Sequence, residues 1–297
     1  MSVLALDIGG TKLAAAIVSD TGEQRGTRTE ATGADAGQAL DRAIRLGADL
    51  LDSDLLDGED ITGVGVATMG ITRTDGVALA PSVPGWAQLR IPARLREAFD
   101  GLPVTVINDV KAATLAELAW GALRGVSEGL YLNLGTGVAA GIIAGGTLLG
   151  GAHGAAGEFG YLVPTVAELG LTPGSAPVEE RIGGRWAAEA ATRELGVPVT
   201  VAELFQVAQH DLRARAVLDR LLDEIGLWAG NLAVITDPEV LVLGGGLMHS
   251  ASPVLDRVSE LVTRIVPFPP RVVTARFGAA AALAGAGAAA YAFMGEQ

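Results

Sequence analysis

The sequence predicts an α/β protein made of two lobes, each built on a mixed β-sheet. The chain has 297 residues, which is more than a typical single domain contains. Its apolar residues recur at strand spacing in some segments and at helix spacing in others. Residues 6–18 and residues 132–143 also share one plan: an apolar strand, a glycine-threonine turn, and a strand of small apolar residues.

This resemblance between the two stretches indicates an internal repeat with a period of about half the chain, which does not fit a short repeat array. Each half should therefore open with a similar hairpin. The alternative is that two unrelated hairpins happen to turn on glycine. We expect a first lobe over residues 1–110, joined by the C-terminal helix 278–297, and a second lobe over residues 111–277.

The first half begins with strands at residues 3–7 and 13–18, joined by a Gly-Gly turn. The further elements expected in this half are a strand near residues 25–29, a helix over 36–51, a strand over 61–68, a loop or hairpin over 71–86, a strand over 103–107, and a helix starting near Lys111.

The second half begins with strands at residues 130–134 and 138–144 and continues into a glycine-rich loop over residues 150–161. The remaining elements expected here are an irregular insertion over 165–177, helices over 178–195, 201–209, 211–235 and 253–265, strands over 239–243 and 271–275, and an alanine-rich helix that ends the chain.

The composition excludes several classes of function. The net charge is −13 and no basic cluster occurs, so nucleic acid and anionic membranes are not expected partners. The chain contains no cysteine, which excludes disulfides, thiolate catalysis and cysteine zinc sites. The apolar run at residues 277–294 is mostly Ala and Gly, so we expect a closely packed helix rather than a membrane span. We expect a cytoplasmic protein, because the N-terminus shows no leader pattern.

The most informative stretch is residues 103–117, PVTVINDVKAATLAE. Asn108 and Asp109 lie between a β-branched strand and an alanine-rich helix. Aspartate is rarely buried unless its carboxylate is paired, and the carboxyl ends of strands are where α/β folds bind ligands. We therefore interpret Asp109 as a general base directed at a hydroxyl group.

Three glycine-rich turns could bind a nucleotide, because glycine allows backbone N–H groups to approach phosphate closely. Each could equally be an ordinary turn, but three in one chain favour a nucleotide site. Asp7 precedes the first turn and could hold a hydrated Mg²⁺. The residues of the three turns are Gly9, Gly10, Thr11 and Lys12; Gly135, Thr136 and Gly137; and Gly244, Gly245 and Gly246.

Several other polar residues are weaker candidates. Glu158 lies between glycines with no helix to explain its charge, whereas Glu179 could be the solvated first turn of a helix. The three histidines, His153, His210 and His249, show no metal-ligand spacing, and we interpret His210 and His249 as surface residues. Lysines 12 and 111 could reach phosphate, although a solvated lysine is the simpler interpretation for both.

Taken together, these segments resemble the ROK family of sugar kinases and sugar-responsive repressors. The matching pieces are LALDIGGTKLAAAIV, PSVPGW, INDVKAATLAE, LGTGVAAGII, GGAHGAAGEFGY, VEERIGG, VLVLGGGL and FGAAAALAGA. The resemblance implies a two-lobed, actin-like fold of the hexokinase and ribonuclease H-like type, with a cleft between the lobes. It also implies ATP and Mg²⁺ as cofactors and a homodimer.

The resemblance also assigns roles to residues. It places Asp7, Thr11 and Lys12 in a first phosphate loop, Thr136 and Gly137 in a second, and the triplet Gly244, Gly245 and Gly246 on the adenosine side. Asn108, Asp109, Glu158 and Glu179 fall on sugar-contacting positions, with Asp109 as the base that accepts a hydroxyl proton during phosphoryl transfer.

The chain departs from the family pattern on the acceptor side. The family's zinc site has lost its cysteines, and its histidine is replaced by Tyr161, so zinc is not expected. Ser82 replaces an asparagine, Gly70 follows Met69 where Pro-Gly is usual, and Lys111 replaces a small or amide residue. We expect Tyr161 and Gly70 to border the substrate.

We therefore expect an ATP-dependent kinase that phosphorylates a sugar or a sugar-like polyol. A kinase for a C7-cyclitol in an aminocyclitol pathway is a close alternative, because the acceptor side has changed. A non-catalytic sugar sensor is the alternative from another class, and an actin-like ATPase acting on proteins is disfavoured.

Overall fold

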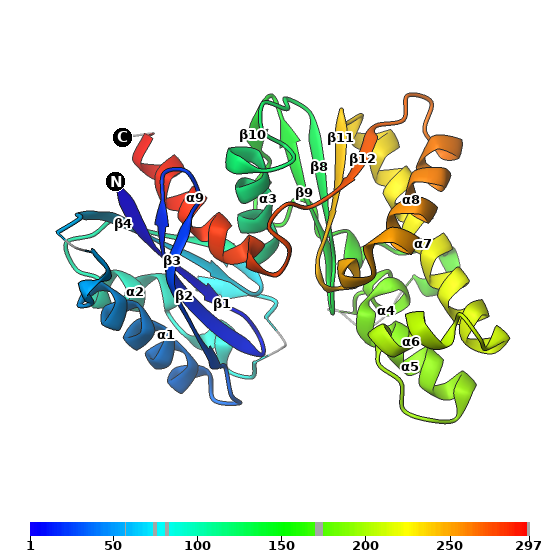
Figure 1. The fold of residues 1–297 in the computed structure, drawn as a ribbon, viewed down its shortest axis with the longest axis horizontal. Coiled ribbons are helices and arrows are strands. Elements are labelled where there is room, and N and C mark those ends of the chain that lie inside the picture. The colour runs from blue at the N-terminus through cyan, green and yellow to red at the C-terminus, as the bar shows by residue number, and fades with distance from the viewer. Residues whose placement is uncertain (57, 74–75, 81–82, 170–174, 296–297) are drawn as a thin grey trace. The chain divides into compact units, whose positions relative to one another are not determined.

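The computed structural model describes every residue except 57, 74–75, 81–82, 170–174 and 296–297. The chain forms two compact units (Figure 1). Unit 1 comprises Met1–Arg124, Gly150–Ala155 and Ala279–Gln297, and unit 2 comprises Gly125–Leu149 and Ala156–Gly278. Unit 1 is thus assembled from three separate segments of the chain.

Unit 1 is organised on a five-stranded sheet with the order β3-β2-β1-β4-β7. Strand β2 runs antiparallel to both β1 and β3, whereas β4 is parallel to β1 and β7 is parallel to β4. The elements of this unit are β1 (Ser2–Ile8), β2 (Lys12–Ser19), β3 (Gln24–Ala31), α1 (Ala36–Leu51), β4 (Ile61–Thr68), β5 (Ile71–Arg73), β6 (Gly76–Ala78), α2 (Ile91–Ala98), β7 (Val104–Asn108), α3 (Asp109–Trp120) and α9 (Ala281–Gly295).

The two faces of this sheet bury different sets of side chains, because successive strand residues point to opposite faces. Leu4, Leu6 and Ile8 of β1 join an apolar core with residues of α1 and α2. Val3 and Ala5, which alternate with them, join a second core to which α3 and α9 contribute. The alternation places Asp7 on the same face as Val3 and Ala5.

The C-terminal helix α9 is held in unit 1 by very close backbone contacts. A Cβ atom at Gly285 would overlap the carbonyl group of Ala112 in α3, and a Cβ atom at Gly65 in β4 would overlap the carbonyl group of Ala286. In the part of the chain that the structure describes, one helix is long and apolar enough to cross a membrane, Gly278–Gly295, and half of it is buried in the fold. Its small residues therefore serve packing, as the composition predicted.

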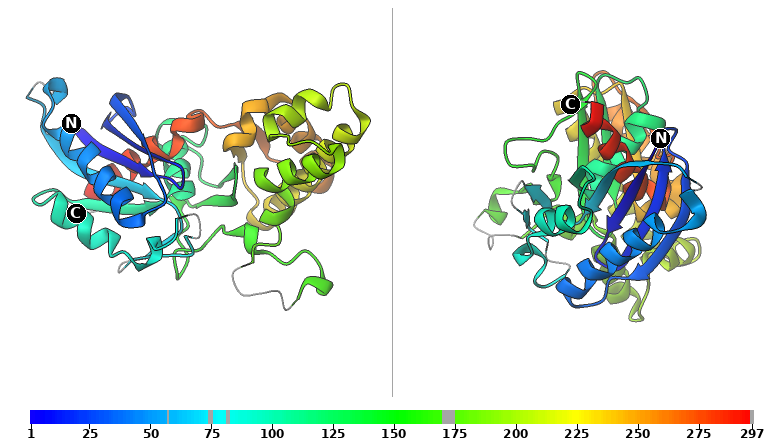
Figure 2. Two further views of the ribbon diagram at one scale, coloured as in Figure 1. Left: turned by 90° about the horizontal axis from the view of Figure 1, so that it is seen from below. Right: turned by 90° about the vertical axis from the view of Figure 1, so that its left-hand side faces the viewer.

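Unit 2 has a second five-stranded sheet with the order β10-β9-β8-β11-β12. Leu130, Leu132 and Leu134 of β8 point into a core built with the helices, among which α7 and α8 lie side by side (Figure 2). The elements of this unit are β8 (Gly129–Leu134), β9 (Val138–Ala144), β10 (Thr147–Leu148), α4 (Glu179–Ile182), α5 (Gly184–Leu195), α6 (Val201–Val207), α7 (Leu212–Thr236), β11 (Val240–Gly244), α8 (Ala251–Ile265) and β12 (Arg271–Thr274).

The two sheets share one topology. In each, a hairpin with an antiparallel third strand is extended by two parallel strands that follow later in the chain. Strands β1 and β8 occupy the same central place in their sheets, so Asp7 and Asn133 are equivalent positions. The shared topology favours the internal repeat over two unrelated hairpins.

Some elements differ from the sequence-based expectation. The helix expected over residues 178–195 is broken at Gly183, where a Cβ atom would lie 2.7 Å from the carbonyl oxygens of Glu179 and Thr136. Helix α2 was not expected. The first compact segment ends at Arg124 rather than residue 110, because α3 packs along α9 in unit 1.

Replacing Gly285 with alanine should destabilise unit 1 by about 1–3 kcal/mol, because the added methyl group would push α3 away from α9. This would occur even though alanine favours helix more than glycine does. Denaturant unfolding followed by circular dichroism measures the change. Gly295→Ala is the matched control in the same helix, since nothing lies within 4 Å of a Cβ atom there. Equal stability of the two variants would contradict the packing argument.

Candidate active site

The junction between β7 and α3 is fixed by Asn108. Its side-chain oxygen accepts hydrogen bonds from the backbone N–H groups of Val110 (3.0 Å) and Lys111 (3.1 Å), so it caps the helix. Its amide group donates to the Gly70 carbonyl oxygen at 2.9 Å. The helix therefore starts at Asp109, two residues earlier than expected. Most of the polar capacity of Asn108 holds the junction, which leaves one N–H for a ligand.

Asp109 and Asp7 are both half-buried carboxylates in unit 1. Asp7 is next to the last residue of β1, and Asn108 ends β7, with β4 between these two strands. Burial raises the pKa of Asp109 to about 6, against the hydrogen bond that its carboxylate accepts from the Val110 N–H. Burial and then repulsion by Asp109 raise the pKa of Asp7 to about 7, and Lys12 opposes this shift. The pKa of Asp109 is thus shifted toward neutral pH, as a general base requires.

The first glycine turn is a tight hairpin supported by the neighbouring strand. The Gly9 N–H donates to the Lys12 carbonyl oxygen at 3.0 Å, and the buried Thr32 hydroxyl donates to the Gly9 carbonyl oxygen at 2.7 Å. Thr11 and Lys12 have exposed side chains. The turn therefore leaves its threonine and lysine accessible to a ligand.

The second glycine turn, in unit 2, is held by α4 and α5. The Gly135 N–H donates to the Gly137 carbonyl oxygen at 3.1 Å, and the Gly184 N–H donates to the Gly135 carbonyl oxygen at 2.8 Å. The carboxylate of Glu179 accepts a hydrogen bond from the Val138 N–H at 3.0 Å. Burial raises the pKa of Glu179, and the bond from Val138 opposes that rise. Through this hydrogen bond to Val138, Glu179 helps to hold the turn in place.

The third glycine element lies beside the second. Gly244 pairs with Asn133 across β11 and β8, and a Cβ atom at Gly245, whose φ is 89°, would lie 2.5 Å from the Leu134 carbonyl oxygen. Gly246 faces open space. Only glycine fits this close crossing of two chain segments. The second and third turns, two of the three that the sequence analysis assigned to one nucleotide site, thus lie next to each other in unit 2.

A cavity of about 510 Å³ opens where the two turns meet α5 and α6. Its walls are largely apolar, with several polar groups among them, which suits a flat heteroaromatic base. The residues that line it are Gly135, Thr136, Gly184, Arg185, Ala188, Val199, Thr200, Val201, Ala202, Phe205, Gly246, Leu247, His249 and Ser250.

Sequence reasoning missed most of this cavity. It found the glycines but not the wall from α5 and α6. His249 is exposed, as expected, but it also lines the cavity. The ring nitrogen Nδ1 of His249 lies 2.6 Å from the Gly246 carbonyl oxygen, so the side chain is tied to the third turn. The mostly apolar run Val199-Thr200-Val201-Ala202 at the start of α6 was the available signal, but nothing local shows which way such a wall faces.

Glu158, Tyr161 and Glu179 form a second polar group in unit 2. Burial raises the pKa of Tyr161, and the carboxylates of Glu158 and Glu179 raise it further. The phenol therefore stays protonated and can donate a hydrogen bond. The structure thus brings together the three residues that the sequence assigned to the acceptor side of this unit.

Two departures from the family pattern, Lys111 and Ser82, remain to be placed in the structure. Lys111 was expected to be solvated, but only 5% of its surface is exposed. Ser82 lies outside the described residues.

The residues present fit a nucleotide and a hydrated magnesium ion. The cavity beside the second and third turns would hold a base, and the glycine turns offer N–H groups for phosphates. No group of three or more His, Asp or Glu side chains suited to a metal occurs among the residues described. Mg²⁺ needs only one or two carboxylates, since water and phosphate complete its shell, and Asp7 could supply one.

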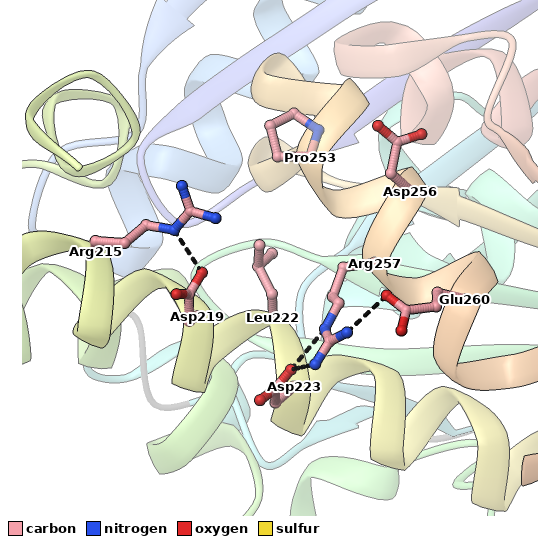
Figure 3. A pocket seen from close by; sticks show the side chains of 8 residues that line it. All are labelled: Arg215, Asp219, Leu222, Asp223, Pro253, Asp256, Arg257 and Glu260. Atoms are coloured by element: carbon pink, nitrogen blue, oxygen red, sulfur yellow. Dashed lines mark hydrogen bonds and ion pairs between the residues drawn. The ribbon is translucent and has the colours of Figure 1, made fainter. Parts of the chain in front are cut away.

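A hollow between α7 and α8 in unit 2 is a different kind of feature (Figure 3). Five of its six charged side chains bind one another: Arg215 pairs with Asp219, and Arg257 pairs with both Asp223 and Glu260. Exposed charges that are paired in this way add little to stability and offer little to a ligand.

Comparisons with known proteins give one consistent result. The model of the ROK family matches residues 3–293. An N-acetylmannosamine kinase from Escherichia fergusonii is 32% identical over 256 residues, covering 83% of this chain and 84% of the relative.

Two solved structures match nearly the whole chain. A ROK hexokinase from Thermus thermophilus has a TM-score of 0.85 and 29% identity, covering 100% of both chains. A ROK family glucokinase from Streptomyces griseus, solved with glucose and AMPPNP, has a TM-score of 0.83 and 28% identity, covering 98% of this chain and 100% of that one.

Replacing Asp109 with asparagine should stabilise the fold at pH 8 by about 1–3 kcal/mol. The pKa of Asp109 rises from 3.8 to about 6 on folding, so its ionised form disfavours the folded state at pH above 6. The gain should shrink as the pH falls from 6 and vanish below 3.8, where the carboxyl group is neutral in both states. Thermal unfolding of both proteins between pH 4 and 8 measures this, and a gain that does not vary with pH would contradict it.

Proposed function

The chain belongs to the ROK family, and we propose that it transfers the γ-phosphoryl group of ATP to a hydroxyl group of a hexose or an N-acetylhexosamine. The expected resemblance to this family, and the actin-like fold that goes with it, are confirmed. The observation that carries the proposal is Asp109, a half-buried carboxylate with a pKa near 6 at the end of β7.

In this reaction Asp109 accepts the proton of the acceptor hydroxyl. The oxygen of that hydroxyl forms a bond to the γ-phosphorus while the bond between the γ-phosphorus and the ADP oxygen breaks. Asn108 keeps Asp109 in place by capping α3. When bound, ATP supplies the phosphoryl group, and Mg²⁺ screens its charge. Asp7 would hold the ion through water, and the hydroxyl group of Thr11 and the ammonium of Lys12 would bind phosphate oxygens.

Unit 2 supplies the other parts. The cavity beside Gly246 would hold the adenine and ribose, and the turn at Gly135, Thr136 and Gly137 would bind phosphate through its N–H groups. Glu158 and Glu179 would accept hydrogen bonds from neighbouring hydroxyl groups, and the protonated Tyr161 would donate one. A homodimer, as the family resemblance implies, and a cytoplasmic location complete the proposal.

The acceptor class rests on the relatives, whose names specify N-acetylmannosamine, glucose and hexose. A C7-cyclitol has no such support, and Tyr161 is the feature that keeps it as an alternative acceptor. A non-catalytic sugar sensor would have no use for a carboxylate tuned toward neutral pH.

ADP release should be detected with ATP, Mg²⁺ and at least one member of a panel of hexoses, N-acetylhexosamines and cyclitols. Asp109→Asn should lower kcat by roughly 10²-fold or more, because the base is lost. The kcat of the wild-type protein should fall as the pH drops through about 6, where Asp109 becomes protonated. Asp100→Asn, at an exposed turn before β7, is the control. Sugar binding without ADP release would favour the sensor.

Ala188→Phe should raise the KM for ATP by about tenfold or more while leaving the KM for the acceptor nearly unchanged, because the phenyl ring would occupy the cavity. Steady-state kinetics with each substrate varied in turn measures this. Arg193→Phe is the control, since this side chain is exposed on the same helix and does not line the cavity. An unchanged KM for ATP would place the nucleotide elsewhere.

A further inference from the structure

The six residues Gly150–Ala155 belong to unit 1, although the chain on both sides of them belongs to unit 2. Lys111 binds this segment, hereafter the crossing loop. Its ammonium group donates to the Gly150 carbonyl oxygen at 3.1 Å and also to the Gly154 carbonyl oxygen. Gly154 has a φ of 74°, and a Cβ atom there would lie 2.7 Å from the Thr72 carbonyl oxygen. The loop thus lies against unit 1 with no room for a side chain at Gly154.

The type of residue at position 111 is informative. The chain has 21 Lys and Arg residues, and only Lys12 and Lys111 are lysines. An ammonium group is compact and can donate to two carbonyl oxygens from one point, whereas a guanidinium group is planar and larger. Burying a charge is costly unless it is hydrogen-bonded, so these carbonyl contacts are part of what makes Lys111 tolerable at 5% exposure.

Lys111 also lies next to the junction of β7 and α3, which carries the proposed base Asp109. Its own N–H donates to the Asn108 side chain, so Asp109 and Lys111 belong to the same first turn of α3. The helix turn that carries the proposed base is therefore the one that holds the crossing loop.

The chain is fixed again directly after the crossing loop. The Gly157 carbonyl oxygen accepts a hydrogen bond from the Ala140 N–H at 2.7 Å, and a Cβ atom at Gly157 would overlap the Ala140 carbonyl group. Only two residues separate Gly154, held by Lys111, from Gly157, held by β9. Glu158 follows at once, and Tyr161 lies three residues beyond it.

We propose that Lys111 is a positioning residue for the phosphoryl acceptor: by binding the crossing loop to the first turn of α3, it restricts the segment that presents Glu158 and Tyr161. This inference rests on the proposed function, in which those two side chains contact the acceptor. Lys111 itself touches neither substrate.

The first test needs no substrate. Lys111→Met should increase amide hydrogen exchange in residues 150–155 by about tenfold or more, because the loop loses both contacts with the ammonium group. Lys111→Arg should not restore protection. In the wild-type protein, an amine-reactive reagent should modify exposed Lys12 at least about ten times faster than Lys111, as mass spectrometry would show. Unchanged exchange in the methionine variant would overturn the proposal.

The second test separates positioning from general stability. Lys111→Met should raise the KM for the acceptor by about tenfold or more while the KM for ATP stays within about twofold. Arg220→Met, which removes an exposed cation on α7, is the control and should change neither value. Gly154→Ala releases the loop from its other side, so it should reproduce the selective rise in acceptor KM even if the methionine variant fails to fold.

An equal rise in both KM values, or faster exchange without a change in acceptor KM, would overturn the positioning role. Absence of turnover by the wild-type protein with every acceptor would instead overturn the proposed function. The exchange measurement would still decide whether Lys111 holds the loop.

Discussion

The burial of Asp7 and Asp109 in one unit is the constraint on which the rest of the proposed site depends. Each carboxylate is harder to ionise in the folded protein than in water, and the charge of Asp109 raises the pKa of Asp7 further. Such an arrangement persists only if the surrounding fold holds it firmly. The Asn108 cap, the support of the first turn by Thr32 and the packing of α9 on α3 provide that rigidity. In the proposed function, Mg²⁺ held by Asp7 through water would lessen the repulsion between the two carboxylates, so binding of the ion would stabilise the folded site.

The sequence was most informative where structure is set by neighbours in the chain. The hairpins around Gly9 and Gly135, the strand before Asp109 and the alanine-rich last helix were all predicted, because glycine turns and apolar periodicity are local signals. The family resemblance then supplied roles that local patterns could not. Asp109 and the three glycine turns were thus candidate site residues from the sequence, whereas their hydrogen-bond partners could not be predicted.

What the sequence missed depends on contacts between distant residues. In the sequence, Lys111 cannot be told from a solvated lysine, because its partners are the carbonyl groups of Gly150 and Gly154, about forty residues later in the chain. Gly183 interrupts a segment with good helical spacing because the Thr136 carbonyl group lies against it. The wall of the cavity comes from two helices whose apolar residues could equally have entered the core. In each case the deciding partner is far away in sequence.

The three-segment composition of unit 1 has a consequence for how the protein is made. Helix α9 covers the face of the sheet that carries Val3 and Ala5, and it is synthesised after all of unit 2. Until residue 295 has left the ribosome, that apolar face lacks one of the two helices that cover it, while all of unit 2 has already been synthesised. Domains usually fold in the order of their synthesis. Here the later unit could be complete first. The N-terminal sheet of the nascent chain would then expose apolar surface for most of its time on the ribosome.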